Sequence, residues 1–351
     1  MVYLGSHINV VYSDEHWLHS DPGGTHPENP NRLEEALATL KSSTVWSTTR
    51  LYYEESLDES VLLLVHDREY VEWIKRECSR GFHYIDSDTY VTRHTYRVAA
   101  RYSTLAYIAT HKGFEEKEMW ILLPRPPGHH AGRRGVALGA PTQGFCIFNH
   151  SAVAAKSLLE KTRKVLVIDF DAHHGNGTQE IFWNEPHVIH VDIHQHGIYP
   201  GTGWVSDSGS GEAVGTKINI PLPPYAGDEV YVWVLEKIVK PLNKQYSFEA
   251  VVVSAGFDSY AGDPLTQLNV TEAAYEAIAL YLYELFKEKR VRTIISILEG
   301  GYGRGLREGF KAYVEALAGK RAKRRIKGKP PSSRVYRELR EVLSKYHGIE
   351  L

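Results

Sequence analysis

A short apolar run that ends in alternating ionisable residues constrains this chain more than any other segment. Residues 165–168 read Val-Leu-Val-Ile, which is typical of a strand covered on both faces. Asp169, Asp171 and His173 follow at alternate positions, and alternate residues of an extended chain point to the same side. Two carboxylates and an imidazole should therefore converge at the end of this strand. Burying such a cluster is unfavourable unless a cation compensates it.

Similar apolar runs recur along the chain and alternate with helical patterns. This alternation predicts an α/β fold with a mostly parallel central sheet and helices on both faces, in which ligands bind at the carboxyl ends of the strands. The expected strands cover residues 8–12, 119–123, 164–171, 187–193, 250–258 and 292–298, and the expected helices cover 32–40, 69–80, 96–112, 150–160, 178–183, 228–241, 271–288, 306–318 and 334–346. We expect Asn31 to cap the first helix, and residues 81–95 and 194–215 to form loops.

Composition narrows the class of protein. The 351 residues carry a formal net charge of −2, so bulk charge indicates neither nucleic acid nor a membrane as a partner. Residues 1–11 lack the basic start of a signal peptide, and no apolar run approaches the ~20 residues of a membrane span. The two cysteines give no disulfide framework, so we expect a cytoplasmic protein.

The polar ends of the expected strands carry residues suited to a metal. Two carboxylates and one imidazole fit Zn²⁺ with an open coordination position, and we predict Asp171, His173 and Asp258 as its ligands. Asp169 lies one pleat deeper, where it suits a supporting role behind the ligands or a hard monovalent cation. A Zn²⁺ ion held there would polarise a carbonyl group and activate water.

Two histidines and a tyrosine complete a set for metal-assisted amide hydrolysis. His129 and His130 lie in a Pro- and Gly-rich loop after the strand at 119–123 and supply a general base and acid. Tyr302 stands between glycines after the strand at 292–298, so its hydroxyl is placed to donate to a developing oxyanion.

The motif series resembles the zinc-dependent histone deacetylase and acetylpolyamine amidohydrolase superfamily, including its prokaryotic members. The resemblance spans residues 8–318, which we expect to form a catalytic domain within 1–318, and leaves 319–351 as a basic connector with a C-terminal helix. The motifs are Pro-Pro-Gly-His-His-Ala at 126–131, Gly-Phe-Cys at 144–146, Asp-Phe-Asp-Ala-His-His-Gly-Asn-Gly at 169–177, Pro-Gly-Thr-Gly at 200–203, Ala-Gly-Phe-Asp at 255–258 and Leu-Glu-Gly-Gly-Tyr at 298–302.

This resemblance implies a three-layer arginase-like fold, one Zn²⁺ per chain and removal of acetyl from an amine. It implies that His130 is the general base and acid and that Asn176 orients it. It also implies that Asp169 orients His129 and that Tyr302 stabilises the oxyanion.

The resemblance further implies a K⁺ site beside Asp169, Asp171 and His173, completed by Asp192 and the carbonyl of Ile193. Relatives often have Ser where Asp192 stands, so this ligand departs from the family pattern.

Substrate contacts are also implied. Phe145 and Tyr199 should wall the channel, and the Gly144 carbonyl should accept from the substrate amide. Leu265 stands where a polyamine-selective relative carries an acid, so it disfavours that device for binding a second ammonium group. Acetylated protein lysine, acetylpolyamine and other small acetylated amines all remain open as substrates.

Three further assignments stay open. Either Asp86 or Asp88 is expected to hold the substrate backbone, and Arg32 either lines an internal product channel or is solvated at a helix start. Residues 320–329 hold seven Lys or Arg in ten positions. They form either a solvated, mobile connector or a contact for an acidic partner or nucleic acid. A homo-oligomer is compatible with the sequence.

Two other functions fit the sequence less well. A binuclear manganese ureohydrolase shares the fold, but its second metal needs carboxylates where this chain has Gly175 and Tyr260. A non-catalytic acetyl-lysine binder would be expected to lose a metal ligand or Tyr302, and neither is lost.

Overall fold

A computed structural model describes residues 7–322 and 324–351 of the chain. Residues 1–6, which belong to the segment that we expect not to be a signal peptide, lie outside these ranges. Lys323 of the basic segment 320–329 lies outside them as well. Eight strands form one sheet in the order β2-β1-β5-β10-β9-β6-β7-β8, and every neighbouring pair is parallel. The strands are β1 (Ile8–Val11), β2 (Thr49–Tyr52), β5 (Met119–Leu122), β6 (Val165–Asp169), β7 (Val188–Gln195), β8 (Lys217–Leu222), β9 (Ala250–Ala255) and β10 (Thr293–Leu298).

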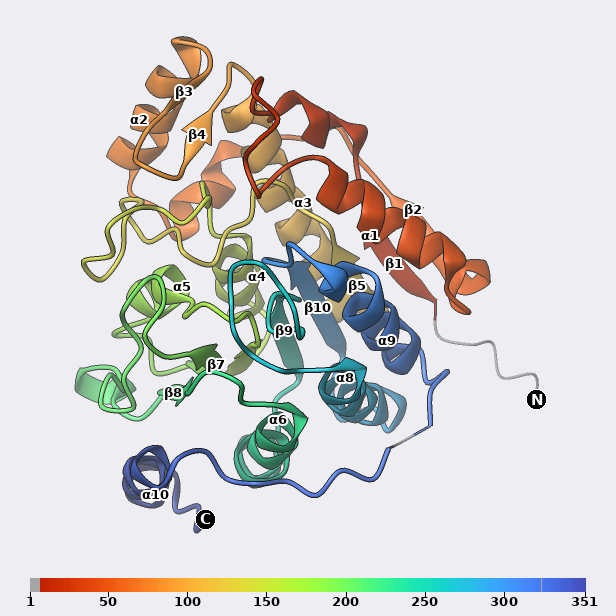
Figure 1. Ribbon diagram of the computed structural model, residues 1–351, viewed down its shortest axis with the longest axis vertical. Helices are drawn as coiled ribbons and strands as arrows, with labels where there is room; N and C mark the ends of the chain where they lie inside the picture. The colour runs from red at the N-terminus through yellow and green to blue at the C-terminus, as the bar shows by residue number, and fades with distance from the viewer. Residues whose placement is uncertain (1–6, 323) are drawn as a thin grey trace.

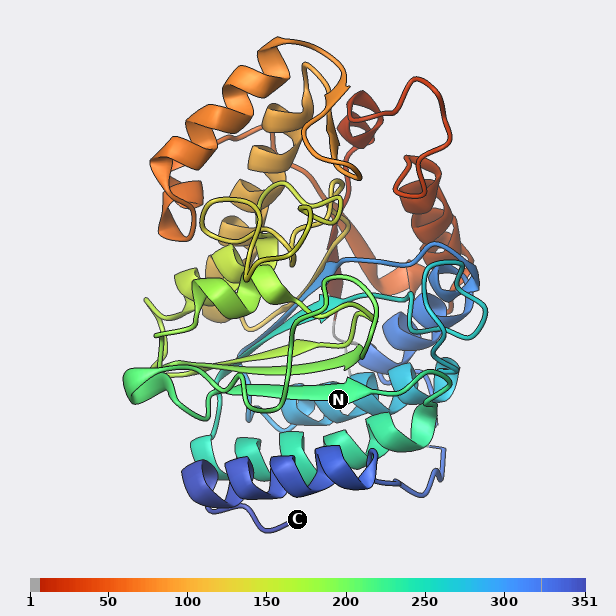
Figure 2. The same ribbon diagram turned by 60° about the vertical axis from the view of Figure 1, so that its left-hand side comes forward.

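Helices cover both faces of this sheet, as predicted, and give three layers (Figures 1 and 2). Alternate residues of β9 show the cause, because Val251 and Val253 join one apolar core while Ala250 and Val252 join the other. A strand buried on both faces needs a continuous apolar run. The first core includes α1 (Asn31–Ser42), α6 (Asp228–Val234), α8 (Glu272–Lys287), α9 (Glu308–Leu317) and α10 (Ser333–His347), and the second includes α3 (Thr95–Glu116), α4 (His150–Leu158) and α5 (Asn176–Ile181).

Two edge strands were not predicted. In β2, which lies at one edge, Arg50 and Leu51 are exposed, so the apolar signal of a buried strand is missing. In β8, at the other edge, buried Lys217 and Asn219 alternate with apolar residues. Pro221 also interrupts the pattern, and an edge strand tolerates proline.

Two local predictions were wrong. The expected loop at 81–95 contains a small antiparallel pair, β3 (His83–Tyr84) and β4 (Tyr90–Val91), which lies beside α2 (Arg68–Ser79) (Figure 1). Asn31 is the first residue of α1 and does not cap it. Its backbone N–H is instead accepted by the side chain of Asn29, at 3.0 Å. The Pro at position 30 already favours the start of a helix one residue earlier.

The C-terminal segment packs against the rest of the chain. Helix α10 runs along the β8 side of the molecule (Figures 1 and 2), and its Leu339 and Leu343 belong to the first core. Within the basic segment, Arg321 and Arg324 form ion pairs with the buried Glu276 of α8. These two side chains are therefore anchored to α8, although Arg324 also remains half exposed to solvent. The short α7 (Lys240–Tyr246) follows α6 through one π-helical segment, Leu235–Val239.

No helix within the described ranges is both long and apolar enough to cross a membrane.

Candidate metal centre and active site

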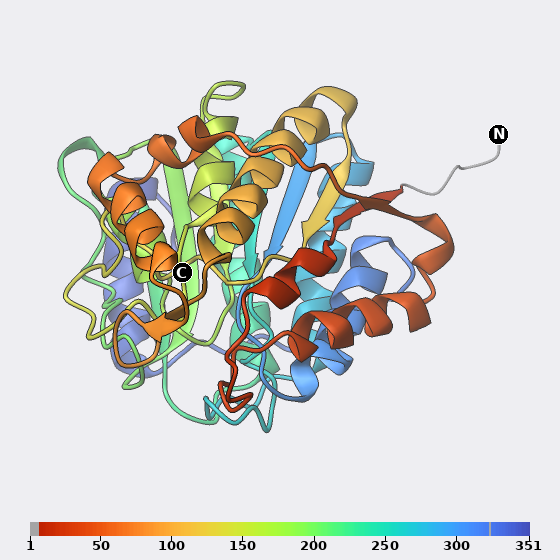
Figure 3. The ribbon, with the colours of Figure 1, turned by 90° about the horizontal axis from the view of Figure 1, so that it is seen from above.

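A cavity of about 230 Å³ lies at the carboxyl ends of the central strands. Strands β5, β10, β9 and β6 are neighbours in the sheet, so the loops that follow them meet there, as expected for ligand sites in parallel sheets. Figure 3 shows the central strands side by side, with their arrows pointing toward the same edge of the sheet. The cavity is lined by Asp88, Pro127, His129, His130, Gly144, Phe145, Cys146, Asp171, His173, Ile198, Tyr199, Leu265, Gly300 and Tyr302.

The three predicted metal ligands converge at the floor of this cavity. The Nδ1 atom of His173 lies 3.2 Å from Asp171 Oδ1 and 2.9 Å from Asp258 Oδ2. The other oxygen of each carboxylate accepts a backbone N–H. Gly300 donates to Asp171 Oδ2 at 2.7 Å, and Ala172 donates to Asp258 Oδ1 at 2.8 Å. One donor atom of each side chain thus remains for a shared ligand.

Local backbone geometry makes room for this cluster. A Cβ atom on Gly256 would lie 2.0 Å from Asp171 Oδ2, and one on Gly300 would lie 2.4 Å from Asp258 Oδ2. Both positions therefore require glycine, because real Cβ atoms do not approach so closely. Burial alone would lower the pKa of His173, but its contacts with Asp171 and Asp258 raise that pKa to about 10. The two buried carboxylates thus demand a positive charge at this point, and the site fits a divalent cation such as Zn²⁺.

The two histidines of the 126–131 motif are held in different ways. His129 Nδ1 lies 3.0 Å from Asp169 Oδ2, and His130 Nδ1 lies 2.8 Å from Asn176 Oδ1. The amide of Asn176 donates to the Ala137 carbonyl at 3.0 Å, so its oxygen faces His130 and accepts the Nδ1–H. The other ring nitrogen of His130, Nε2, is then free to accept a proton.

Charge separates the two histidines further. Burial opposes a charge on either ring. At His129, however, the carboxylates of Asp171 and Asp169 raise the pKa well above its usual range. At His130, burial and then the positive charges of His129 and His173 hold the pKa well below its usual range. His130 is therefore the neutral member of the pair.

Glu299 supports this loop and was missed as a site residue. Its buried carboxylate accepts the backbone N–H groups of Gly128 and His129, at 2.8 and 3.1 Å, and the hydroxyl of Ser151, at 3.1 Å. The only sequence signal was its place in the 298–302 motif.

Tyr302 lies on the opposite side of the cavity, between Phe145 and Arg32. Its ring packs edge-on against Phe145, with centroids 5.9 Å apart, and the Arg32 guanidinium lies 4.6 Å from its centroid. Arg32 is 4% exposed and donates to the carbonyls of Glu299 and Gly301. Solvation of Arg32 at a helix start is therefore wrong. Burial raises the pKa of Tyr302 well above its usual range, against the opposing charge of Arg32, so its hydroxyl stays protonated.

The predicted substrate residues line the cavity with one exception. Gly144, Phe145, Tyr199 and Leu265 all lie there, and the Tyr199 ring stands perpendicular to His130 at 4.9 Å. Asp88 lines the cavity as well. Asp86 lies behind it and accepts backbone N–H groups from residues 88, 89 and 143. Of the two acids, Asp88 is thus the one that faces the cavity.

A second cluster lies behind the first. Asp169, His190 and Asp192 are all buried, and their ligand atoms lie within 4.8 Å of one another. His190 Nε2 is 3.6 Å from Asp192 Oδ2, and neither ring nitrogen of His190 has a hydrogen-bond partner in the described parts of the chain. His190 was missed, although His190, Asp192 and His194 alternate along β7 in the way that revealed the first cluster.

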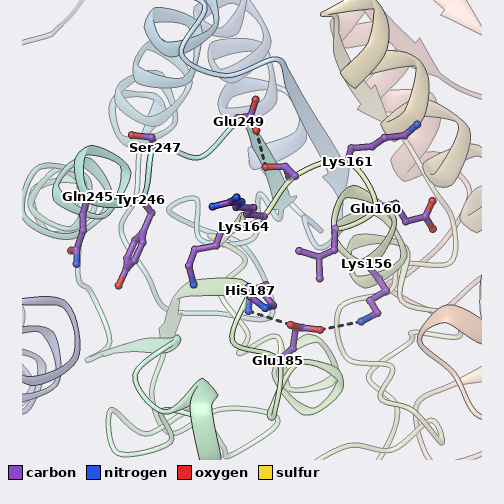
Figure 4. A pocket seen from close by; sticks show the side chains of 13 residues that line it. Lys156, Glu160, Lys161, Lys164, Glu185, His187, Gln245, Tyr246, Ser247 and Glu249 are labelled. Carbon is purple, nitrogen blue, oxygen red and sulfur yellow. Dashed lines mark hydrogen bonds and ion pairs between the residues drawn. The ribbon is translucent and has the colours of Figure 1, made fainter.

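A wider depression lies at the amino ends of β6, β7 and β9, far from the metal ligands in these strands (Figure 4). Its charged side chains largely satisfy one another. Lys156 lies 3.0 Å from Glu185, Glu249 accepts from Thr162 at 3.1 Å, and Lys164 donates to the Pro186 carbonyl. Nothing in it suggests a second catalytic site.

Comparisons with known proteins identify the family of this chain. A model of the histone deacetylase domain family matches residues 26–317. An uncharacterized protein of Methanocaldococcus jannaschii is 40% identical over 306 residues, covering 87% of this chain and 86% of that protein. A probable deacetylase of Archaeoglobus fulgidus is 33% identical over 297 residues, covering 84% and 80%. The crystal structure of the HDA15 HD domain superposes with a TM-score of 0.85 at 32% identity, covering 97% and 96% of the two chains. With its fold, its cavity and these relatives in agreement, the chain belongs to the histone deacetylase family.

Proposed function

We propose that this protein is a zinc-dependent deacetylase that hydrolyses the acetyl amide of an acetylated amine and releases acetate. The observation that carries the proposal is the convergence of Asp171, His173 and Asp258, of which Asp171 and His173 line the same cavity as His130 and Tyr302. When bound by the three ligands, Zn²⁺ supplies polarisation of the amide carbonyl and a lowered pKa for water.

The chain's own residues then move the protons. His130, held neutral with its Nδ1–H on Asn176, accepts a proton at Nε2 from the attacking water and later passes it to the leaving amine. His129, paired with Asp169, carries positive charge beside it. The protonated hydroxyl of Tyr302 donates a hydrogen bond to the oxygen on which negative charge develops. Phe145 and Tyr199 line the cavity, where their rings would exclude water from the alkyl chain of the acetylated amine.

The K⁺ site remains a separate prediction. The second cluster, Asp169, His190 and Asp192, suits a K⁺ ion only in part. The carboxylates of Asp169 and Asp192 suit a hard monovalent cation, but the unpartnered nitrogens of His190 do not. No step of the proposed reaction depends on this ion.

Acetyl-lysine in a protein or peptide is the substrate that we favour, and an acetylpolyamine is the second candidate. Apart from the metal ligand Asp171, Asp88 is the acid that lines the cavity, and Leu265 lies on its wall. A polyamine-selective relative carries an acid for the distal ammonium group at the position of Leu265, and the apolar side chain here does not supply that charge.

The geometry disfavours a binuclear ureohydrolase. A Cβ atom at Gly175 would lie 2.5 Å from Asp169 Oδ2, so an acid at this position could not be accommodated without rearrangement. Position 175 therefore supplies no carboxylate for a second divalent ion beside the first.

Acetate release tests the proposal. The zinc-loaded protein should release acetate from an acetyl-lysine peptide with a higher kcat/KM than from acetylputrescine. Asp258→Ala should abolish release from both. If the loaded protein releases no acetate from any acetylated amine in a panel, the enzyme assignment is wrong. A preference for acetylputrescine would overturn the choice of substrate only.

A further inference from the structure

One buried carboxylate outside the metal cluster contacts the backbone of two residues that line the cavity. Asp263 is 5% exposed. Its Oδ2 accepts the backbone N–H of Tyr302 at 2.8 Å, and its Oδ1 accepts the backbone N–H of Leu265 at 3.0 Å. Tyr302 and Leu265 both line the cavity, so one side chain ties together the proposed oxyanion donor and a wall of the substrate site.

Asp263 lies in a turn that packs closely on the Tyr302 segment. A Cβ atom on Gly303 would lie 3.2 Å from the Cα atom of Asp263 and 3.4 Å from the Gly262 carbonyl oxygen. The segment 301–303 belongs to no helix or strand, and the backbone bends at residue 303. Two hydrogen bonds hold it from outside, one from Arg32 to the Gly301 carbonyl and one from Tyr302 to Asp263. The direction of the Tyr302 side chain thus depends on these anchors.

A negative charge on the Asp263 side chain lowers the stability of the folded protein. Burial, and then the nearby charge of Asp258, raise the pKa of Asp263 to about 7. A neutral side chain would avoid the desolvation and the repulsion. Asparagine, however, has only one oxygen, so it accepts one of the two N–H groups and turns its own NH₂ toward the other.

We propose that Asp263 is a positioning residue that holds the backbones of Tyr302 and Leu265 in register beside the cavity. This inference rests on the proposed deacetylase function. Asp263 touches neither substrate nor metal in this scheme and acts through the two backbone groups that it accepts.

The test compares the wild-type protein with Asp263→Asn, both zinc-loaded, on an acetyl-lysine peptide. We expect kcat to fall by roughly 10- to 100-fold, because a displacement of about 1 Å at a reacting group has an effect of this size, with a smaller change in KM through Leu265 and with bound zinc unchanged. In a Tyr302→Phe background the same substitution should change kcat by less than about twofold, because the hydroxyl that it positions is absent. Asp263→Glu keeps the charge but displaces the carboxylate, so it should lower kcat as well.

Asp228→Asn is the matched control. Asp228 also accepts two hydrogen bonds, from the N–H and hydroxyl of Thr271, but does not line the cavity. It should leave kcat unchanged. An unchanged kcat in both Asp263 variants, or an equal loss with and without the Tyr302 hydroxyl, would overturn the proposal.

Hydrogen exchange separates this outcome from a failure of the proposed function. The Tyr302 amide should exchange faster in Asp263→Asn than in the wild-type protein, whether or not the wild-type protein releases acetate. If wild-type protein is inactive and exchange at this amide is unaltered by the substitution, both proposals are wrong. If wild-type protein is active and exchange is unaltered, only the role of Asp263 is wrong.

Discussion

Replacement of Tyr302 by phenylalanine removes one atom from the site and leaves its packing intact. The contact of the ring with Phe145 and its approach to Arg32 involve carbons that both side chains share. In the described parts of the chain the hydroxyl makes no intramolecular hydrogen bond. Its removal therefore strands no partner, and we expect the melting temperature to change by less than about 2 °C.

The effect of Tyr302→Phe on catalysis should be large by contrast. Loss of one oxyanion donor typically lowers kcat by ~10²–10³, or about 2.7–4 kcal/mol of transition-state stabilisation. Because the hydroxyl acts on charge that develops during the reaction, KM should change little. The measurement is steady-state acetate release from an acetyl-lysine peptide, with zinc content and melting temperature determined on the same samples.

Two results would refute this reasoning. An unchanged kcat would remove Tyr302 from the mechanism. A loss of kcat together with a loss of bound zinc would show that the variant perturbs the metal site and not the oxyanion.

Three further predictions concern metal, pH and packing. Asp258→Ala should lose stoichiometric zinc because it removes a ligand, and a variant that keeps one zinc per chain by elemental analysis would contradict the ligand set. Burial lowers the pKa of Lys217 from 10.5 to about 7, so between these values the native state binds fewer protons than the unfolded state. Its contribution to the free energy of unfolding should therefore rise as pH rises from 7 to 10.5, and denaturant titrations that show the same pH slope for Lys217→Met would contradict this. The double substitution Arg321→Ala and Arg324→Ala leaves the buried Glu276 without these two ion-pair partners. It should therefore lower the free energy of unfolding by about 1–3 kcal/mol. An unaltered midpoint of urea unfolding would contradict this prediction.

The centre of the fold and the convergence of the metal cluster could be predicted because burial there leaves a readable pattern. Strands such as β6 and β9 are covered on both faces, so their apolar runs are continuous, and the polar residues after Asp169 stand out against them. The edge strands β2 and β8 face solvent or carry buried polar groups, and their patterns do not differ from those of loops.

The supporting residues of the site could not be predicted for a different reason. An Asp beside Gly and Pro, as at Asp263, is ordinary turn chemistry that accounts for its bond to Leu265, and only the three-dimensional structure shows that its other oxygen reaches Tyr302. His190 did leave a signal, because it alternates with Asp192, but alternation alone does not show that its ring nitrogens lack partners. Long-range hydrogen bonds of this kind are invisible to sequence periodicity.

The adjacency of β6 and β9 also bears on how this protein is made. His173 and Asp258 are separated by 85 positions, and the Gly300 amide that holds Asp171 lies 129 positions after it. Chains emerge from the ribosome from the N-terminus onward and fold as units. The first two ligands therefore leave the ribosome long before the third, and before the amide that orients them. Capture of a metal ion by all three side chains would then be one of the last events in the biogenesis of this protein, and a loaded site would report that residues up to at least 300 have been synthesised and have joined the sheet.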